Sequence, residues 1–150
     1  MHSFILKRQP KSYNSWRGAT GIKKANYKTA IENSFKHFYP THTTLTEDLY
    51  GTMYYFFKKD LESDADNLSK PLWDCLTGFL FTDDRQVKLR IVGSFDISKN
   101  DFNVLNFTGI SGEVITELLD AFDTEDHIVY IECGHLNHSM FKFNLESSGN

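Results

Sequence analysis

The sequence predicts an α+β fold, in which one β-sheet of about four strands is covered by helices. Segments with the alternation or the β-branched composition of strands take turns with segments whose apolar residues recur at helical spacing. The connections between these segments are short. The chain has 150 residues, of which 40% are apolar, and this is enough for a single domain over residues 1–150 with a real hydrophobic core.

The first part of the chain predicts a strand, a loop, a helix and a second strand. Ser3–Leu6 is a short apolar strand, and the Pro-, Ser-, Asn- and Gly-containing stretch KRQPKSYNSWRGATG after it is typical of a loop. Residues Ile22–Tyr39 form a helix that Pro40 ends. The apolar residues at helical spacing in it are Tyr27, Ile31, Phe35 and Phe38. The continuous aromatic run Leu49–Lys59 is typical of a central strand.

A second helix is predicted in Leu68–Phe79. Its apolar face consists of Leu68, Leu72, Cys75, Leu76 and Phe79. Proline lacks the N–H that a helix interior needs, so Pro71 is expected in the first turn, and the helix is expected to begin between Asn67 and Lys70.

The last part predicts a strand, an acidic helix and a final strand. The stretch RQVKLRIVGSF, residues 85–95, alternates apolar and basic side chains, as a strand does. Residues 111–122 place five apolar residues on one face of an acidic amphipathic helix: Val114, Ile115, Leu118, Leu119 and Phe122. The β-branched run His127–Gly134 is a strand.

Charge is distributed unevenly along the chain, although the net charge is only −4. Residues 1–40 contain eight Lys or Arg and one acid, whereas residues 96–150 contain two Lys and ten acids. The basic segment predicts a face that is open to a polyanion. The acidic helix either lies on the far side from this face, or covers a partner or narrows the substrate range. A Lys-rich, solvated helix face is the ordinary alternative. The candidate DNA-binding residues are Lys7, Arg8, Lys11, Arg17, Lys23, Lys24 and Lys28.

The cysteine count and the N-terminus favour a cytoplasmic protein. Cys75 and Cys133 are too few for a disulfide framework. The opening apolar run is followed at once by Lys7 and Arg8, the reverse of a signal peptide, and no apolar run approaches membrane-spanning length. No membrane partner is therefore expected.

Five aspartates lie close together in the stretch DADNLSKPLWDCLTGFLFTDDRQV, residues 64–87: Asp64, Asp66, Asp74, Asp83 and Asp84. Crowded carboxylates repel one another unless a cation neutralises them, and carboxylates are the ligands that Mg²⁺ prefers. Asp66, Lys70 and Asp74 are spaced by four and share one helix face. A helix cap, a polar turn and a surface ion pair would explain the same residues. Spacing alone leaves both interpretations open.

The compound motif resembles that of the RusA family of Holliday junction resolvases. The family pattern is Asp-x-Asp-Asn-x-x-Lys, then Asp-x-Leu, then Asp-Asp-x-Gln-Val, and this chain has DADNLSK, DCL and DDRQV. The resemblance implies a mixed sheet, metal ligands at Asp64, Asp66 and Asp84, and a catalytic lysine at Lys70. Asp83, Asn67 and Asp74 match family positions of secondary importance. Relative to compact family members, residues near 100–124 would be an acidic helical insertion.

The resemblance also implies an activity and partners. It implies a homodimeric endodeoxyribonuclease that uses Mg²⁺ or Mn²⁺ to resolve Holliday junctions, a form of branched DNA, by hydrolysing phosphodiester bonds in paired symmetric nicks. Lys70, beside several carboxylates, is expected to stay charged and to stabilise developing negative charge. Two alternatives remain: a nuclease of the same fold acting on other branched DNA, and a non-catalytic acidic interaction protein.

Overall fold

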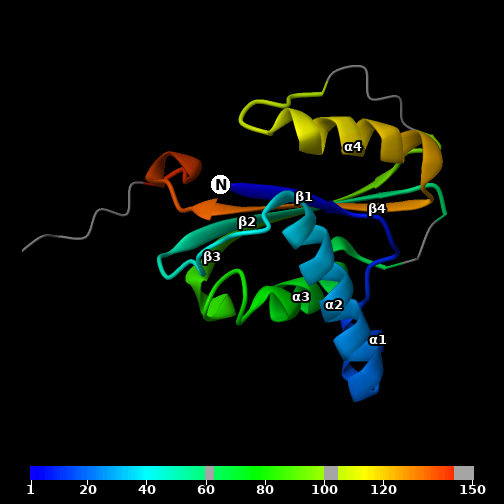
Figure 1. Cartoon of the computed structure of the whole chain (residues 1–150), viewed down its shortest axis with the longest axis horizontal. Coiled ribbons are helices and arrows are strands. Elements are labelled where there is room, and N and C mark those ends of the chain that lie inside the picture. The colour runs from blue at the N-terminus through cyan, green and yellow to red at the C-terminus, as the bar shows by residue number, and fades with distance from the viewer. Residues whose placement is uncertain (60–62, 100–104, 144–150) are drawn as a thin grey trace, which may run out of the picture.

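A four-stranded mixed sheet forms the middle layer of the molecule (Figure 1). The computed structural model describes residues 1–59, 63–99 and 105–143. The strands lie in the order β1-β4-β2-β3, with β4 antiparallel to both its neighbours and β2 parallel to β3. Their bounds are β1 (His2–Leu6), β2 (Leu49–Phe57), β3 (Val87–Asp96) and β4 (His127–His135). The predicted α+β fold with one mixed sheet of four strands is confirmed.

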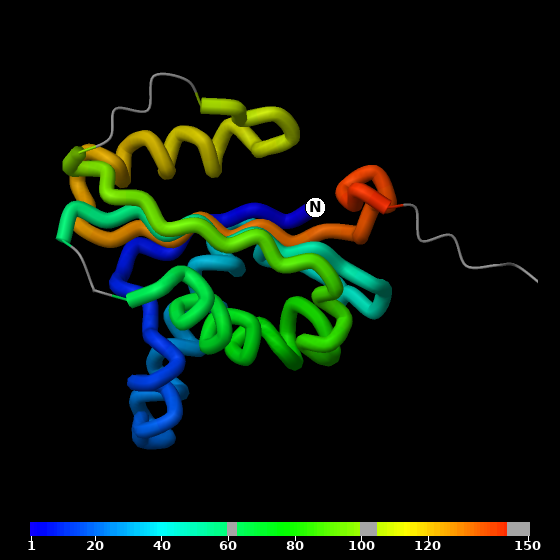
Figure 2. The backbone as a smooth tube through the Cα atoms, turned by 180° about the vertical axis from the view of Figure 1, so that it is seen from behind, coloured from blue at the N-terminus to red at the C-terminus, as the bar shows by residue number. Residues whose placement is uncertain are grey.

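Helices cover both faces of this sheet. They are α1 (Tyr13–Arg17), α2 (Gly21–Phe38), α3 (Ala65–Leu76) and α4 (Gly112–Thr124). The first three lie on one side of the sheet and α4 lies on the other, as the views from the front and from behind both show (Figures 1 and 2). The acidic helix is therefore on the face opposite α3. No helix among the described residues is long and apolar enough to cross a membrane.

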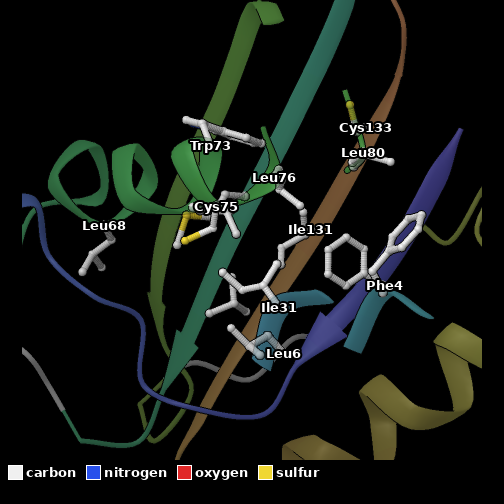
Figure 3. Packing of buried hydrophobic residues seen from close by; sticks show 14 of the residues in the cluster. Phe4, Leu6, Ile31, Leu68, Trp73, Cys75, Leu76, Leu80, Ile131 and Cys133 are labelled. Carbon is white, nitrogen blue, oxygen red and sulfur yellow. The ribbon is translucent and has the colours of Figure 1, made fainter. Parts of the chain in front are cut away.

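The alternation of side chains along the strands divides the core in two. The larger cluster lies between the sheet and α2 and α3, where Leu76 of α3 and Ile31 of α2 lie beside Ile131 of β4 (Figure 3). Trp73 of α3 belongs to the same cluster and packs over β2. The smaller cluster lies under α4 and contains Ile5, Phe56, Val114, Leu118, Ala121, Ile128 and Tyr130. Successive strand residues point to opposite faces, so each strand contributes to both clusters.

Three local expectations are corrected by the structure. The stretch expected to be a loop contains the short helix α1, whose N-cap Ser12 accepts a hydrogen bond from the backbone N–H of Ser15. Helix α3 runs from Ala65 to Leu76, so Pro71 lies in its second turn and Phe79, expected on its apolar face, lies beyond its end. On α4, Leu119 is 43% exposed and Ala121 is buried in its place. Residues 100–104 of the predicted insertion lie outside the described residues.

The early start of α3 has a physical reason. The backbone N–H of Leu68 donates to the carbonyl oxygen of Asp64 at 3.2 Å and closes the first turn. Leu68, Pro71 and Leu72 are all buried, so their packing outweighs the one helical hydrogen bond that proline cannot donate. The start at Ala65 places Asp66 inside the helix, one turn before Lys70.

Helix α3 connects the two parallel strands and packs closely against β2. An ideal Cβ on Gly51 of β2 would lie 2.8 Å from Cη2 and 2.9 Å from Cζ3 of Trp73, and 3.1 Å from Cγ1 of Val87. The indole of Trp73 is fully buried, so it has no room to move aside. The missing side chain at Gly51 therefore sets how closely α3 approaches the sheet.

We expect Gly51→Ala to lower the free energy of unfolding by about 1–3 kcal/mol, the usual cost of overpacking a filled core. Gly18→Ala is the control, because Gly18 has an ordinary negative φ and no atom within 4 Å of its Cβ position. Urea unfolding of both variants checks this. Equal midpoints for Gly51→Ala and the unaltered protein would show that α3 is not held against Gly51.

Candidate active site

The N-terminus of α3 presents two exposed carboxylates. Asp64 is the N-cap, with φ −64° and ψ 147°, yet its side chain makes no capping hydrogen bond. Asp66 lies in the first turn. An N-cap aspartate normally accepts a hydrogen bond from the first turn of its helix. The Asp64 carboxylate is therefore free for another partner, in the field of the helix N-terminus that favours anions.

These carboxylates open into a small cavity. It has a volume of about 360 Å³ and is lined by Tyr13, Asp64, Asp66, Asn67 and Lys70. Tyr13 comes from α1, which packs against α3. We call this space the acidic cavity. It brings together two predicted metal ligands, the predicted catalytic lysine and the secondary residue Asn67.

Lys70 connects α3 to the turn that precedes β3. Its Nζ donates to Oδ1 of Asp74 at 2.5 Å and to Oδ2 of Asp84 at 3.0 Å. Burial works to lower the pKa of Lys70, but the hydrogen bonds and charges of Asp74 and Asp84 outweigh it, and the pKa is raised. Lys70 is thus charged at neutral pH, as its neighbours in the sequence predicted.

The Asp-Asp-x-Gln-Val stretch builds this turn. Asp84–Gln86 is a single 3₁₀ turn, and Asp83 and Gln86 form a reciprocal capping box around it. The Gln86 amide also donates to the carbonyl oxygens of Leu45 and Glu47, at 3.1 and 3.0 Å. Asp83 and Gln86 therefore hold the turn in place, and Asp84 is left to face Lys70.

The carboxylate of Asp83 is paired with the neighbouring Arg85. Nη2 of Arg85 lies 2.6 Å from Oδ2 of Asp83, and the backbone N–H of Arg85 donates to Oδ1 at 2.8 Å. The hydrogen bonds from the side chain and backbone of Arg85 lower the pKa of Asp83 to about 2. Its position and partners suit the secondary, structural role expected for it.

Arg90 is a further residue at this site that was not predicted from the sequence. Nη2 of Arg90 in β3 donates to the carbonyl oxygen of Asp84 at 2.9 Å and to its Oδ2 at 3.3 Å. The Arg90 guanidinium also lies 5.9 Å from the ring centroid of Trp73. In the sequence Arg90 is one of two basic residues on an alternating strand, and nothing in that pattern separates it from Lys88.

The donor atoms suit a hard divalent cation, although the three predicted ligands do not converge on one point. The carboxylates of Asp64 and Asp66 both line the acidic cavity. Asp84 is not among the residues that line it, and is linked to it by the hydrogen bond from Lys70. Within the described residues, the group whose ligand atoms all lie within 4.8 Å of one another is His37, Glu113 and Glu117, away from α3. Carboxylate oxygens and an uncapped Asp64 fit Mg²⁺ or Mn²⁺.

Two of the predicted DNA-binding residues lie beside the acidic cavity. Arg8 and Lys11 line a second, larger cavity of about 650 Å³, which we call the basic cavity. Asn67 lines both cavities. The basic and acidic groups are therefore adjacent on one side of the molecule.

The other predicted DNA-binding residues have different surroundings. Lys7 pairs with Glu117 of α4 at 3.4 Å, and Nζ of Lys28 lies 3.5 Å from the carbonyl oxygen of Thr77. Arg17 lies 5.8 Å from the ring centroid of Tyr13, and Lys24 lies 5.4 Å from that of Trp16. Lys23 is exposed on the first turn of α2.

Comparison with known proteins finds one family model that matches the chain. The family model described as Endodeoxyribonuclease RusA matches residues 7–101, which is 95 of the 150 residues. The matched region contains every residue of both cavities, the turn before β3 and Arg90, and ends before α4. No curated protein matches the sequence. The chain therefore belongs to the RusA endodeoxyribonuclease family.

Proposed function

We propose that this protein is a divalent-metal-dependent endodeoxyribonuclease that resolves Holliday junctions by paired symmetric nicks. Membership of the family implies a nuclease that acts on Holliday junctions. The observation that carries the finer proposal is that Asp64, Asp66 and Lys70 line one cavity. Two carboxylates that can bind a metal ion and a charged lysine can together support phosphodiester hydrolysis.

Asp64 and Asp66 would hold the metal ion, with Asp84 as the third ligand. A bound Mg²⁺ or Mn²⁺ neutralises charge on a phosphodiester and activates water for attack. Asp84 is suited to this role because Lys70 and Arg90 both contact the same oxygen, Oδ2. Neither of these two contacts involves the other carboxylate oxygen, Oδ1.

Lys70 would stabilise the negative charge that develops on the scissile phosphate. A lysine ammonium has three N–H donors, and Asp74 and Asp84 take two of them. The third donor is left for a phosphate oxygen in the acidic cavity. Because its pKa is raised, Lys70 keeps its proton and acts as an electrostatic stabiliser rather than as a general base.

A homodimer follows from the substrate. Resolution of a four-way junction needs two cuts at symmetric positions, and a two-fold pair of identical sites supplies them. Each protomer would contribute one complete set of Asp64, Asp66, Lys70 and Asp84.

We expect Asp66→Asn to abolish cleavage while junction binding is unchanged or tighter. The substitution removes a ligand oxygen and also relieves repulsion between the carboxylates and the DNA phosphates. Single-turnover cleavage of an end-labelled synthetic junction at saturating Mg²⁺, with binding followed by fluorescence anisotropy, checks both statements. Asp120→Asn, at an exposed position on α4, is the matched control. A wild-type cleavage rate for Asp66→Asn would remove Asp66 from the active site.

We expect Lys70→Ala to slow single-turnover cleavage by about 10²–10³-fold, the cost of losing one electrostatic stabiliser. Lys70→Arg should rescue poorly, because a planar guanidinium does not occupy the place of a compact ammonium. Lys59→Ala is the control, since Lys59 forms a similar pair with Asp126 at 2.6 Å outside the site. A Mg²⁺ titration completes the test. If Lys70→Ala regained the full wild-type cleavage rate at high Mg²⁺, the role of Lys70 would be only to balance the charge of the carboxylates.

A further inference from the structure

The basic cavity is built to hold an anion. It is the larger of the two cavities at the start of α3, and the residues that line it include Arg8, Lys11, Asn14 and Ser15. None of the described residues that line it is acidic. Guanidinium, ammonium, amide and hydroxyl groups are the donors that proteins use to bind phosphate oxygens.

The walls of this cavity are held by packing. The Arg8 guanidinium lies 5.6 Å from the ring centroid of Tyr27, a residue that is fully buried. Pro10 is buried and fixes the backbone between the two basic residues. Ser12 caps α1 by accepting the backbone N–H of Ser15 at 3.2 Å. The Arg8 guanidinium and the backbone that carries Lys11 are thus positioned before a ligand arrives, which reduces the entropy lost on binding.

The two cavities have opposite charge and a common wall. Asn67 lines both cavities. A DNA strand that places one phosphate against Lys70 therefore passes its neighbouring phosphates close to Asn67. The acidic cavity suits a metal ion and the scissile phosphate together, whereas the basic cavity suits a phosphate without a metal. Neighbouring phosphates of one strand match this arrangement.

We propose that the basic cavity binds the phosphate next to the scissile phosphate on the cleaved strand, through Arg8 and Lys11. This inference rests on the proposed function and adds a defined subsite to it. Binding energy from this phosphate positions the scissile phosphate against Lys70, so Arg8 and Lys11 are positioning residues. This role distinguishes Arg8 and Lys11 from Lys7, whose ammonium is already paired with Glu117.

The test is equilibrium binding of synthetic junctions by the full chain carrying Asp66→Asn, so that binding is measured without cleavage. One phosphate at a time, within two nucleotides of the cut, is replaced by an uncharged methylphosphonate. Each junction is titrated with this parent and with a variant that also carries Arg8→Gln and Lys11→Gln. On the unmodified junction we expect the added substitutions to weaken binding on the order of tenfold to a hundredfold.

The decisive result is the coupling between protein and DNA changes. At the phosphate that the cavity holds, the methylphosphonate should weaken binding by the parent and have little effect on the Arg8→Gln, Lys11→Gln variant. The slope of log affinity against log salt should fall by about one unit in that variant. A parent carrying Lys36→Gln and Lys99→Gln, at exposed positions outside both cavities, controls for the loss of two charges.

Two results would overturn the inference. If the protein and DNA changes simply add at every phosphate tested, the cavity holds none of these phosphates and only this inference fails. If the parent does not bind junctions at all, the proposed function fails with it. Arg8→Gln removes the contact with Tyr27 and could destabilise the fold. The single variant Lys11→Gln, with its urea unfolding midpoint measured, is therefore tested in the same way.

Discussion

The ion pair between Lys70 and Asp84 is the interaction on which the arrangement of the site depends. It joins the middle of α3 to the turn before β3, two segments that are connected through the α3–β3 loop. The Lys70 side chain is 42% exposed and that of Asp84 is 27% exposed. A pair with this exposure adds little to stability, and its importance is that it fixes where two functional groups lie. Arg90 and Gln86 support it, one by holding Asp84 and the other by anchoring the turn.

The main elements of the fold and the helix face that carries Lys70 could be predicted from the sequence, because they depend on residues that are close together in the chain. The spacing of Asp66, Lys70 and Asp74 defines one helix face without any tertiary information, and the structure pairs Lys70 with Asp74. The alternation in β3 and the helical spacing in α2 and α4 likewise depend only on neighbours in the chain. The roles of Asp64, Asp66 and Asp84 as metal ligands came from resemblance and stay predictions.

What could not be predicted depends on contacts between distant segments. Arg90 lies only six residues after Asp84, but its guanidinium also lies beside the indole of Trp73 in α3, a neighbour that the sequence does not indicate. The start of α3 was misplaced because the rule for proline is local, whereas the burial of Leu68 and Leu72 is a property of the whole core. The basic cavity is formed by the loop before α1 and by the start of α3, which lie far apart in the sequence.

Helix α4 lies across the sheet from α1 and α3, but its Glu117 lines a third cavity together with Lys7 and Arg8. Helix α4 packs on the opposite face, and its Glu117 binds Lys7 and His37. Burial works to raise the pKa of Glu117, but the hydrogen bond from His37 and the nearby charge of Lys7 outweigh it, and the pKa is lowered. The charge of Glu117 is therefore paired locally with Lys7 and His37.

The most direct test of this account is cleavage of a synthetic four-way junction by the unaltered protein, with strands labelled one at a time. Reactions with Mg²⁺, with Mn²⁺ and with excess chelator are compared on sequencing gels, alongside a linear duplex of the same sequence. The account predicts nicks at symmetric positions on two opposite strands, only with metal and only on the junction. Equal cleavage in chelator, or no cleavage of the junction with either metal, would contradict it.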